Sequence, residues 1–250
     1  MSRPHVLTPH NLIAHRGHAA QHIENTYAAI AGAIDCGARF VEIDVQLSSD
    51  RIPMVFHDRT LDKLARIKGT VGDFTCAQLQ ASTLRIDATP ERAMRQDRIW
   101  SLAEIVPLLQ SHAEINLFVE LKRISMLQFG VAEVVAQSLE VLAPIRDQCV
   151  IISYASEALR YARAQGISRV GWVMEPWDDD RLQLARELAP EYLFTDHNII
   201  PASALPLPEM PWQWALYEIG SLELAQTWRN RGAQLLETFR IGEIIAALES

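Results

Sequence analysis

Carboxylate side chains end two of the short apolar runs in this 250-residue chain. Glu42 and Asp44 stand two positions apart, so on a β-strand they face the same side, and Glu120 ends a second run. Carboxylates buried together repel one another and persist only when a cation or a base compensates them. Oxygen ligands without cysteine suit a hard ion, so we expect these three residues to hold Mg²⁺ or Ca²⁺. The alternative is that Glu42 or Glu120 forms an internal ion pair with Arg16 or Lys122.

Two histidines end further runs of the same kind, His15 after Ile13–Ala14 and His57 after Phe56. Imidazoles beside a bound cation can serve as general base and general acid near neutral pH. A single histidine at a strand end is more often structural, but convergence with three carboxylates favours catalysis. The remaining candidates are interpreted as structural or surface residues: His18, His22, His112 and His197.

The formal net charge is −8, and no run of Lys or Arg occurs, which argues against a nucleic-acid ligand. An anionic substrate would therefore need local positive charge or a metal. Arg16 could hold phosphate oxygens bidentately, and Lys122 could add a point charge. The tripeptide Glu24-Asn25-Thr26 is expected to open a helix, with Asn25 or Thr26 as its cap, and to orient a loop rather than contact substrate.

The composition indicates a globular protein, since 49% of the residues are hydrophobic and only 11 are Gly and 12 Pro. Three scattered cysteines fit buried thiols in a reducing compartment better than a disulfide framework. The segment Met1–His10 does not resemble a signal peptide, and no run of 18 apolar residues occurs. We expect a cytoplasmic protein without stable membrane insertion.

Strand-like runs alternate with helical stretches along the whole chain, which predicts a single α/β domain over residues 1–250, a (β/α)₈ TIM barrel. A doubly wound open sheet is the alternative. The eight expected strands are Asn11–His15, Arg39–Gln46, Ile115–Leu121, Cys149–Ser153, Val170–Met174, Tyr192–Thr195, Trp212–Tyr217 and Gln234–Thr238. Barrel chemistry is found at the C-terminal ends of such strands, where the titratable residues stand.

One extra strand-like run, Pro53–His57, follows the second strand too closely for a parallel crossover. It predicts a hairpin with its turn at Ser48–Arg51, which would pair Asp44 with His57. The less regular stretch of about residues 59–111 is interpreted as an insertion on the C-terminal face of the barrel. We expect it to rejoin the barrel at a helix that begins near Ser101.

Five motifs in this order resemble the glycerophosphodiester phosphodiesterases, most closely the cytoplasmic bacterial type. They are His15-Arg16-Gly17, Glu24-Asn25-Thr26, Glu42-Ile43-Asp44, His57-Asp58 and Glu120-Leu121-Lys122. The late run Trp214–Glu218 resembles the tryptophan motif of this family. Two departures are Asp50-Arg51, where the family often has Asp-Gly, and Glu237-Thr238 in place of a final Thr-Asp.

The resemblance implies the TIM barrel with an insertion after the hairpin, and a phosphoric diester hydrolase of glycerol and lipid metabolism. It implies a divalent cation at Glu42, Asp44 and Glu120, with acid/base catalysis by His15 and His57. The implied products are glycerol 3-phosphate and an alcohol, and Trp214 is implied to pack against the glycerol. The expected ligand is therefore a small glycerophosphodiester, and a homo-oligomer is possible.

Three other functions stay open. A lysophospholipase D-like enzyme would use the same site with an apolar groove, for which Leu61, Leu64, Ile67, Val71 and Phe74 are candidates, although core packing also explains them. A glycoside hydrolase could use Glu42 and Glu120, but leaves both histidines without roles. A binding module could retain the fold without catalysis.

Overall fold

The computed structural model describes residues 6–89 and 93–249. The first five residues of the segment Met1–His10 lie outside the described residues, as do positions 90–92 of the predicted insertion and Ser250.

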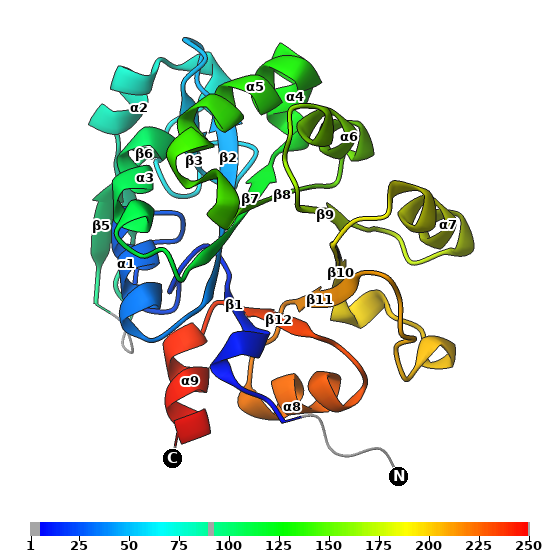
Figure 1. Ribbon diagram of the computed structural model, residues 1–250. Coiled ribbons are helices and arrows are strands. Elements are labelled where there is room, and N and C mark those ends of the chain that lie inside the picture. The colour runs from blue at the N-terminus through cyan, green and yellow to red at the C-terminus, as the bar shows by residue number, and fades with distance from the viewer. Residues whose placement is uncertain (1–5, 90–92, 250) are drawn as a thin grey trace.

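Eight parallel strands form a closed ring (Figure 1). In chain order they are β1 (Leu12–Ala14), β2 (Phe40–Leu47), β7 (Asn116–Leu121), β8 (Cys149–Ser153), β9 (Val170–Val173), β10 (Tyr192–Asp196), β11 (Gln213–Tyr217) and β12 (Leu235–Thr238). Around the ring the order is β1-β12-β11-β10-β9-β8-β7-β2. The pairs Ile13 with Phe40 and Ala14 with Val41 join β1 to β2 and close it. This confirms the TIM barrel and excludes the open doubly wound sheet.

Helices surround the ring, as Figure 1 shows. They are α1 (Tyr27–Asp35), α3 (Leu102–Gln110), α4 (Arg123–Phe129), α5 (Val131–Leu142), α6 (Ser156–Ala164), α7 (Asp179–Leu188), α8 (Leu222–Asn230) and α9 (Ile241–Glu249). Short 3-10 turns complete the connections: η1 (Pro9–Asn11), η3 (Ala143–Gln148), η4 (His197–Ile199) and η5 (Ala202–Ala204). Prolines at 201, 206, 208 and 211 explain why only such turns join β10 to β11.

None of the described helices is by itself long and apolar enough to cross a membrane. Only α4 taken together with the α5–η3 segment passes that test, and the two are bent by 114° at their junction.

Side chains fill the inside of the barrel. Phe118 packs edge-to-face against Phe194 and Tyr192, with ring centroids 5.2 and 5.0 Å apart. Neighbouring residues on β7, such as Leu117 and Val119, belong instead to the larger cluster between strands and helices. The barrel interior is therefore filled with side chains, and a substrate site can open only at the end of the barrel.

The hairpin is formed by β3 (Pro53–Val55), but its register differs from the prediction by one residue. Val45 pairs with Val55, and Phe56 N–H donates to the Asp44 carbonyl at 3.0 Å. Asp44 therefore lies opposite Phe56, and His57 stands one position beyond. The reason is a longer loop, in which Ser48 N–H bonds to Ile52 O at 3.0 Å. Arg51 adopts φ +65° there, the conformation that the glycine of an Asp-Gly turn takes readily.

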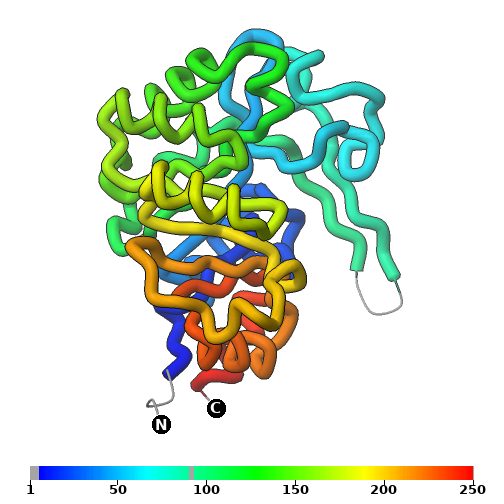
Figure 2. The backbone as a smooth tube through the Cα atoms, turned by 90° about the vertical axis from the view of Figure 1, so that its right-hand side faces the viewer, coloured from blue at the N-terminus to red at the C-terminus, as the bar shows by residue number. Residues whose placement is uncertain are grey.

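The insertion has a small hydrophobic core of its own. It contains η2 (Val71–Asp73), α2 (Cys76–Ala81), the hairpin β4 (Thr83–Ile86) and β5 (Arg95–Arg98), and β6 (Trp100–Ser101), which pairs with β3. Leu61 and Val71 are fully buried in this cluster, and Ile67 and Phe74 pack against it. These side chains therefore pack in or against the core of the insertion, as core packing predicts. Figure 2 shows the β4–β5 hairpin extending along the side of the barrel.

The return to the barrel is fixed at the start of α3, where Glu104 closes a capping box with Ser101. Glu104 accepts hydrogen bonds from Ser101 N–H at 3.0 Å and from the Arg98 guanidinium at 2.7 Å. Burial opposes ionisation, but these bonds outweigh it and lower the pKa of Glu104 to about 2.

We expect Glu104→Gln to lower the free energy of unfolding by about 1–2 kcal/mol at pH 7. Because the folded pKa lies below the unfolded value, this contribution is present above pH 4.5 and is lost as pH falls toward about 2. Urea unfolding of both proteins between pH 7 and pH 3 should show the difference shrinking as the pH falls. A constant difference, or one as small as that of the exposed-site control Glu140→Gln, would refute the assignment.

Candidate active site

A cavity of about 220 Å³ opens at the C-terminal mouth of the barrel. Its lining includes nearly all of the predicted site: His15, Arg16, Glu42, His57, Glu120 and Lys122. Aromatic and aliphatic walls are added by Ile152, Tyr154, Val173, Phe194 and Tyr217. Residues from both ends of the sequence therefore meet at one opening.

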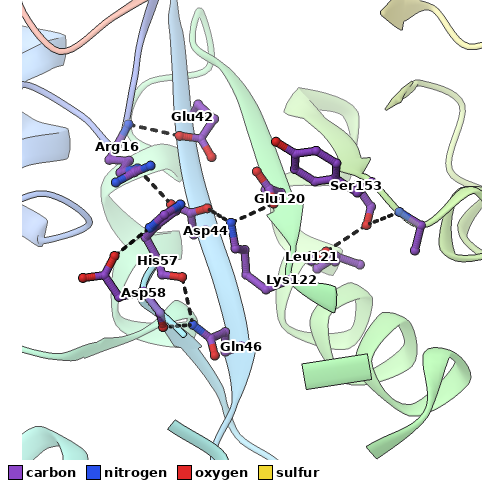
Figure 3. Close-up of polar contacts among 12 residues, drawn as sticks. Arg16, Glu42, Asp44, Gln46, His57, Asp58, Glu120, Leu121, Lys122 and Ser153 are labelled. Atoms are coloured by element: carbon purple, nitrogen blue, oxygen red, sulfur yellow. Dashed lines mark hydrogen bonds and ion pairs between the residues drawn. The ribbon is translucent and has the colours of Figure 1, made fainter. Parts of the chain in front are cut away.

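The three predicted carboxylates lie together. Asp44 on β2 pairs in register with Glu120 on β7, and Glu42 lies two positions before Asp44 on the same face (Figure 3). One ligand atom of each residue lies within 4.8 Å of the others. Such a group offers several oxygen ligands to one hard cation.

Asp44 is surrounded by donors. Its carboxylate lies 3.0 Å from Lys122 Nζ and 3.4 Å from Arg16 Nε, and it accepts a bond from the Asn25 amide at 2.8 Å. Burial alone would raise the pKa of Asp44, but the charges of Lys122 and Arg16 outweigh it and hold the pKa well below the usual range. Lys122 also reaches Glu120 at 2.8 Å. Of the ion pairs considered as an alternative to metal binding, the one between Glu120 and Lys122 is thus present, whereas Glu42 forms none with Arg16 or Lys122 among the described residues.

Among the three carboxylates, Glu42 has the fewest groups that offset its negative charge. One carboxylate oxygen accepts the Arg16 backbone N–H at 3.1 Å, while Oε1 is buried and has no partner among the described residues. Burial, and next the charge of Asp44, raise the pKa of Glu42 well above its usual range. An orphaned carboxylate oxygen beside two further acids fits a divalent cation, which would satisfy the oxygen and offset the repulsion.

His15 projects from the loop after β1 and stacks on Phe239 with ring centroids 4.3 Å apart. Its Nε2 atom lies 3.9 Å from both Glu42 and Glu237. Burial, followed by the positive charge of Arg16, lowers the pKa of His15 well below its usual range. Glu237 was not among the expected site residues, yet it is buried and lines the cavity. Its position on β12 two residues after the interior Leu235 could have indicated this.

His57 is held from two sides. Its Nδ1 atom lies 2.9 Å from Asp58 Oδ1, and this hydrogen bond lowers the pKa of Asp58. The buried Gln46 amide donates to the carbonyl of Phe56 at 2.9 Å. It also donates to the carbonyls of His57 and Asp58 at 3.3 and 3.0 Å (Figure 3). Gln46 follows Asp44 by two positions on β2, so the spacing that indicated the carboxylates also pointed to Gln46.

We expect Gln46→Met to lower kcat by about 10- to 100-fold, because the freed loop no longer fixes the His57 ring. The control is Gln128→Met, which removes another side-chain amide hydrogen bond, 3.0 Å long, to the Gly72 carbonyl. Gln128 does not line the catalytic cavity. Steady-state kinetics and melting temperatures of both variants check this. Equal losses of activity in the two variants would contradict a positioning role for Gln46.

The loop after β1 is shaped by its own residues. Thr26 caps α1 by accepting from Ala29 N–H, as expected, and Glu24 pairs with Arg16 at 2.8 Å. Asn25, at φ +59°, orients Asp44 through two hydrogen bonds. Gly17 is required here, since a Cβ would lie 2.5 Å from the Ala29 carbonyl carbon.

Trp214 does not lie at this site, contrary to expectation. It is buried on the outer side of β11, stacked on Trp177 with centroids 5.3 Å apart. Side chains alternate along a strand, so Trp214 faces the surrounding layer while Ala215 and Tyr217 face inward. Tyr217 therefore lines the cavity in its place.

The sequence profile of the glycerophosphoryl diester phosphodiesterase family matches residues 15–192. The chain belongs to this family. The family segment begins at His15 and includes Glu42, Asp44, His57 and Glu120. Tyr217 and Glu237 lie beyond the matched segment, and both line the cavity of this phosphodiesterase.

Several relatives support the assignment. A glycerophosphodiester phosphodiesterase of Caldanaerobacter subterraneus is 29% identical over 196 residues, 76% of this chain and 77% of the relative. The Bacillus subtilis protein YhdW is 38% identical over 130 residues, and this match spans 51% of each chain. Among solved structures, an Oleispira antarctica phosphodiesterase in complex with the product sn-glycerol-3-phosphate is 24% identical, with a TM-score of 0.79 over 96% of this chain and 97% of that one.

Proposed function

We propose that this protein hydrolyses glycerophosphodiesters to glycerol 3-phosphate and an alcohol. Family membership supports the reaction class. The observation that carries the proposal is one cavity lined by two imidazoles, His15 and His57, together with Glu42 and Glu120, with Asp44 directly beside them.

Glu42, Asp44 and Glu120 would hold a divalent cation, Mg²⁺ or Ca²⁺. Such an ion supplies Lewis-acid stabilisation of charge on phosphoryl oxygens when bound. Lys122 and Arg16 add fixed positive charge at the same place, and their ion pairs with Asp44 hold them there.

In this proposal His15 is the general base. Its buried ring would accept the proton of the attacking hydroxyl, either the glycerol 2-hydroxyl, which yields a cyclic phosphate for later opening by water, or water itself. His57 is the general acid that donates a proton to the departing alcohol. The Asp58 carboxylate at its Nδ1 atom orients the ring for this transfer.

Product identity tests the function. Incubation with glycerophosphoinositol and Mg²⁺ or Ca²⁺, followed by phosphorus-31 NMR, should give glycerol 3-phosphate and free inositol. Release of inositol phosphate and glycerol would mean cleavage of the other ester bond. No turnover of any glycerophosphodiester with either cation would refute the proposal.

The three cysteines Cys36, Cys76 and Cys149 are free thiols. This supports the further proposal of a reducing, cytoplasmic location.

A further inference from the structure

A second, larger cavity of about 800 Å³ continues from the catalytic one. The two cavities share His57, Glu120, Lys122 and Tyr154, but His15 and Glu42 line only the smaller one. Since His57 is the proposed acid, the larger cavity lies on the side where the alcohol departs. This placement rests on the proposed function, and so does any role of the larger cavity in binding the alcohol.

Three arginines line this larger cavity, and each comes from a different part of the chain: Arg59 follows the hairpin, Arg123 opens α4, and Arg181 lies in the first turn of α7. None of their guanidinium groups forms an ion pair with a described residue. Arg123 is stacked over Tyr154, with its guanidinium carbon 4.7 Å from the ring centroid, at the junction of the two cavities.

The charge balance of this cavity is opposite to that of the whole protein. Lys122 and Glu120 neutralise each other at 2.8 Å, which leaves three guanidinium groups against the carboxylate of Glu157. The chain as a whole carries a formal charge of −8. Positive groups gathered in one cleft of an acidic protein attract an anion locally, and guanidinium groups suit phosphate and carboxylate oxygens.

We propose that the larger cavity is a subsite for an alcohol that itself carries an anionic group, a phosphate monoester or a carboxylate. The preferred substrates are then glycerophosphodiesters with a second negative charge on the alcohol. A quaternary ammonium alcohol is disfavoured by the same three arginines.

A matched substrate pair tests this subsite: glycerophosphoinositol and its 4-phosphate differ only in one phosphate monoester on the alcohol. We expect kcat/KM for the 4-phosphate to exceed that for glycerophosphoinositol by about tenfold or more. The combined variant Arg59→Gln, Arg123→Gln and Arg181→Gln should bring that ratio close to one. The control Arg160→Gln, Arg186→Gln and Arg231→Gln removes the same charge outside the cavity and should keep the wild-type ratio.

A ratio near one in the wild type, or a ratio that survives in the cavity variant, would overturn the subsite. So would a preference for an uncharged alkyl alcohol. If neither diester is hydrolysed, the proposed function fails, and calorimetric binding of the two diesters to the wild type still decides the subsite. Tighter binding of the phosphorylated diester that is lost only in the cavity variant would support it, and equal binding would refute it.

Discussion

Replacing His15 with alanine is expected to lower kcat on a glycerophosphodiester by about 10²- to 10⁴-fold, the usual contribution of a general base. His15 lies over the catalytic cavity, with Nε2 3.9 Å from Glu42, and no other histidine except His57 lines that cavity among the described residues. Loss of the ring therefore removes the proposed proton acceptor, and His57 is already assigned to the departing alcohol. Turnover is measured at saturating substrate, so that weaker binding does not contribute.

The control for this variant is His22→Ala, which lies in a separate pocket beside the β4–β5 hairpin. We expect it to keep kcat within about twofold, and circular dichroism melting should show that both variants fold. Near-native turnover by His15→Ala would refute its role as base, whatever the behaviour of His57.

Removal of the divalent cation is the second change from which we expect a large loss of activity. A chelator should abolish turnover of the wild type, and either Mg²⁺ or Ca²⁺ should restore it, since the cation offsets charge on the phosphoryl oxygens. Glu42→Ala should stay inactive at cation concentrations that saturate the wild type, because it removes the ligand whose Oε1 atom has no other partner among the described residues.

Glu140→Ala is the control for the loss of one negative charge, because Glu140 is an exposed residue on α5. Its cation dependence should match that of the wild type in a titration of rate against free cation. Full activity of the wild type in excess chelator would show that the three carboxylates serve another purpose.

Periodicity was sufficient to predict the fold because the eight strand-like runs and the helical stretches between them correspond to the eight barrel strands and their helices. The runs that end in Asp44 and Glu120 are the strands β2 and β7, and their register brings the two carboxylates side by side. Residues two positions apart on a strand share a face in every register, so the sequence alone was enough to place Glu42 and Asp44 on the same face.

Periodicity could not predict features that depend on the length of a loop or on which side chains of a strand point into the barrel. One additional residue in the Ser48–Ile52 loop places Phe56, and not His57, opposite Asp44. Resemblance to a family motif placed Trp214 at the glycerol, whereas the alternation of β11 turns Tyr217 inward. Glu237 stood in the sequence as a departure from the motif, and only ring closure between β12 and β1 brings it to within 3.9 Å of His15.

The most direct test is the position of a bound Mn²⁺ ion in a crystal, located by its anomalous scattering. Glu42 belongs to two groups of potential ligands, one with Asp44 and Glu120 and one with His15 and Glu237. We predict a peak between Glu42, Asp44 and Glu120, with the His15 ring free to accept a proton. A peak bounded by His15, Glu42 and Glu237 would make His15 a ligand and contradict its role as base, and no peak at either group would contradict a metal-dependent phosphodiesterase.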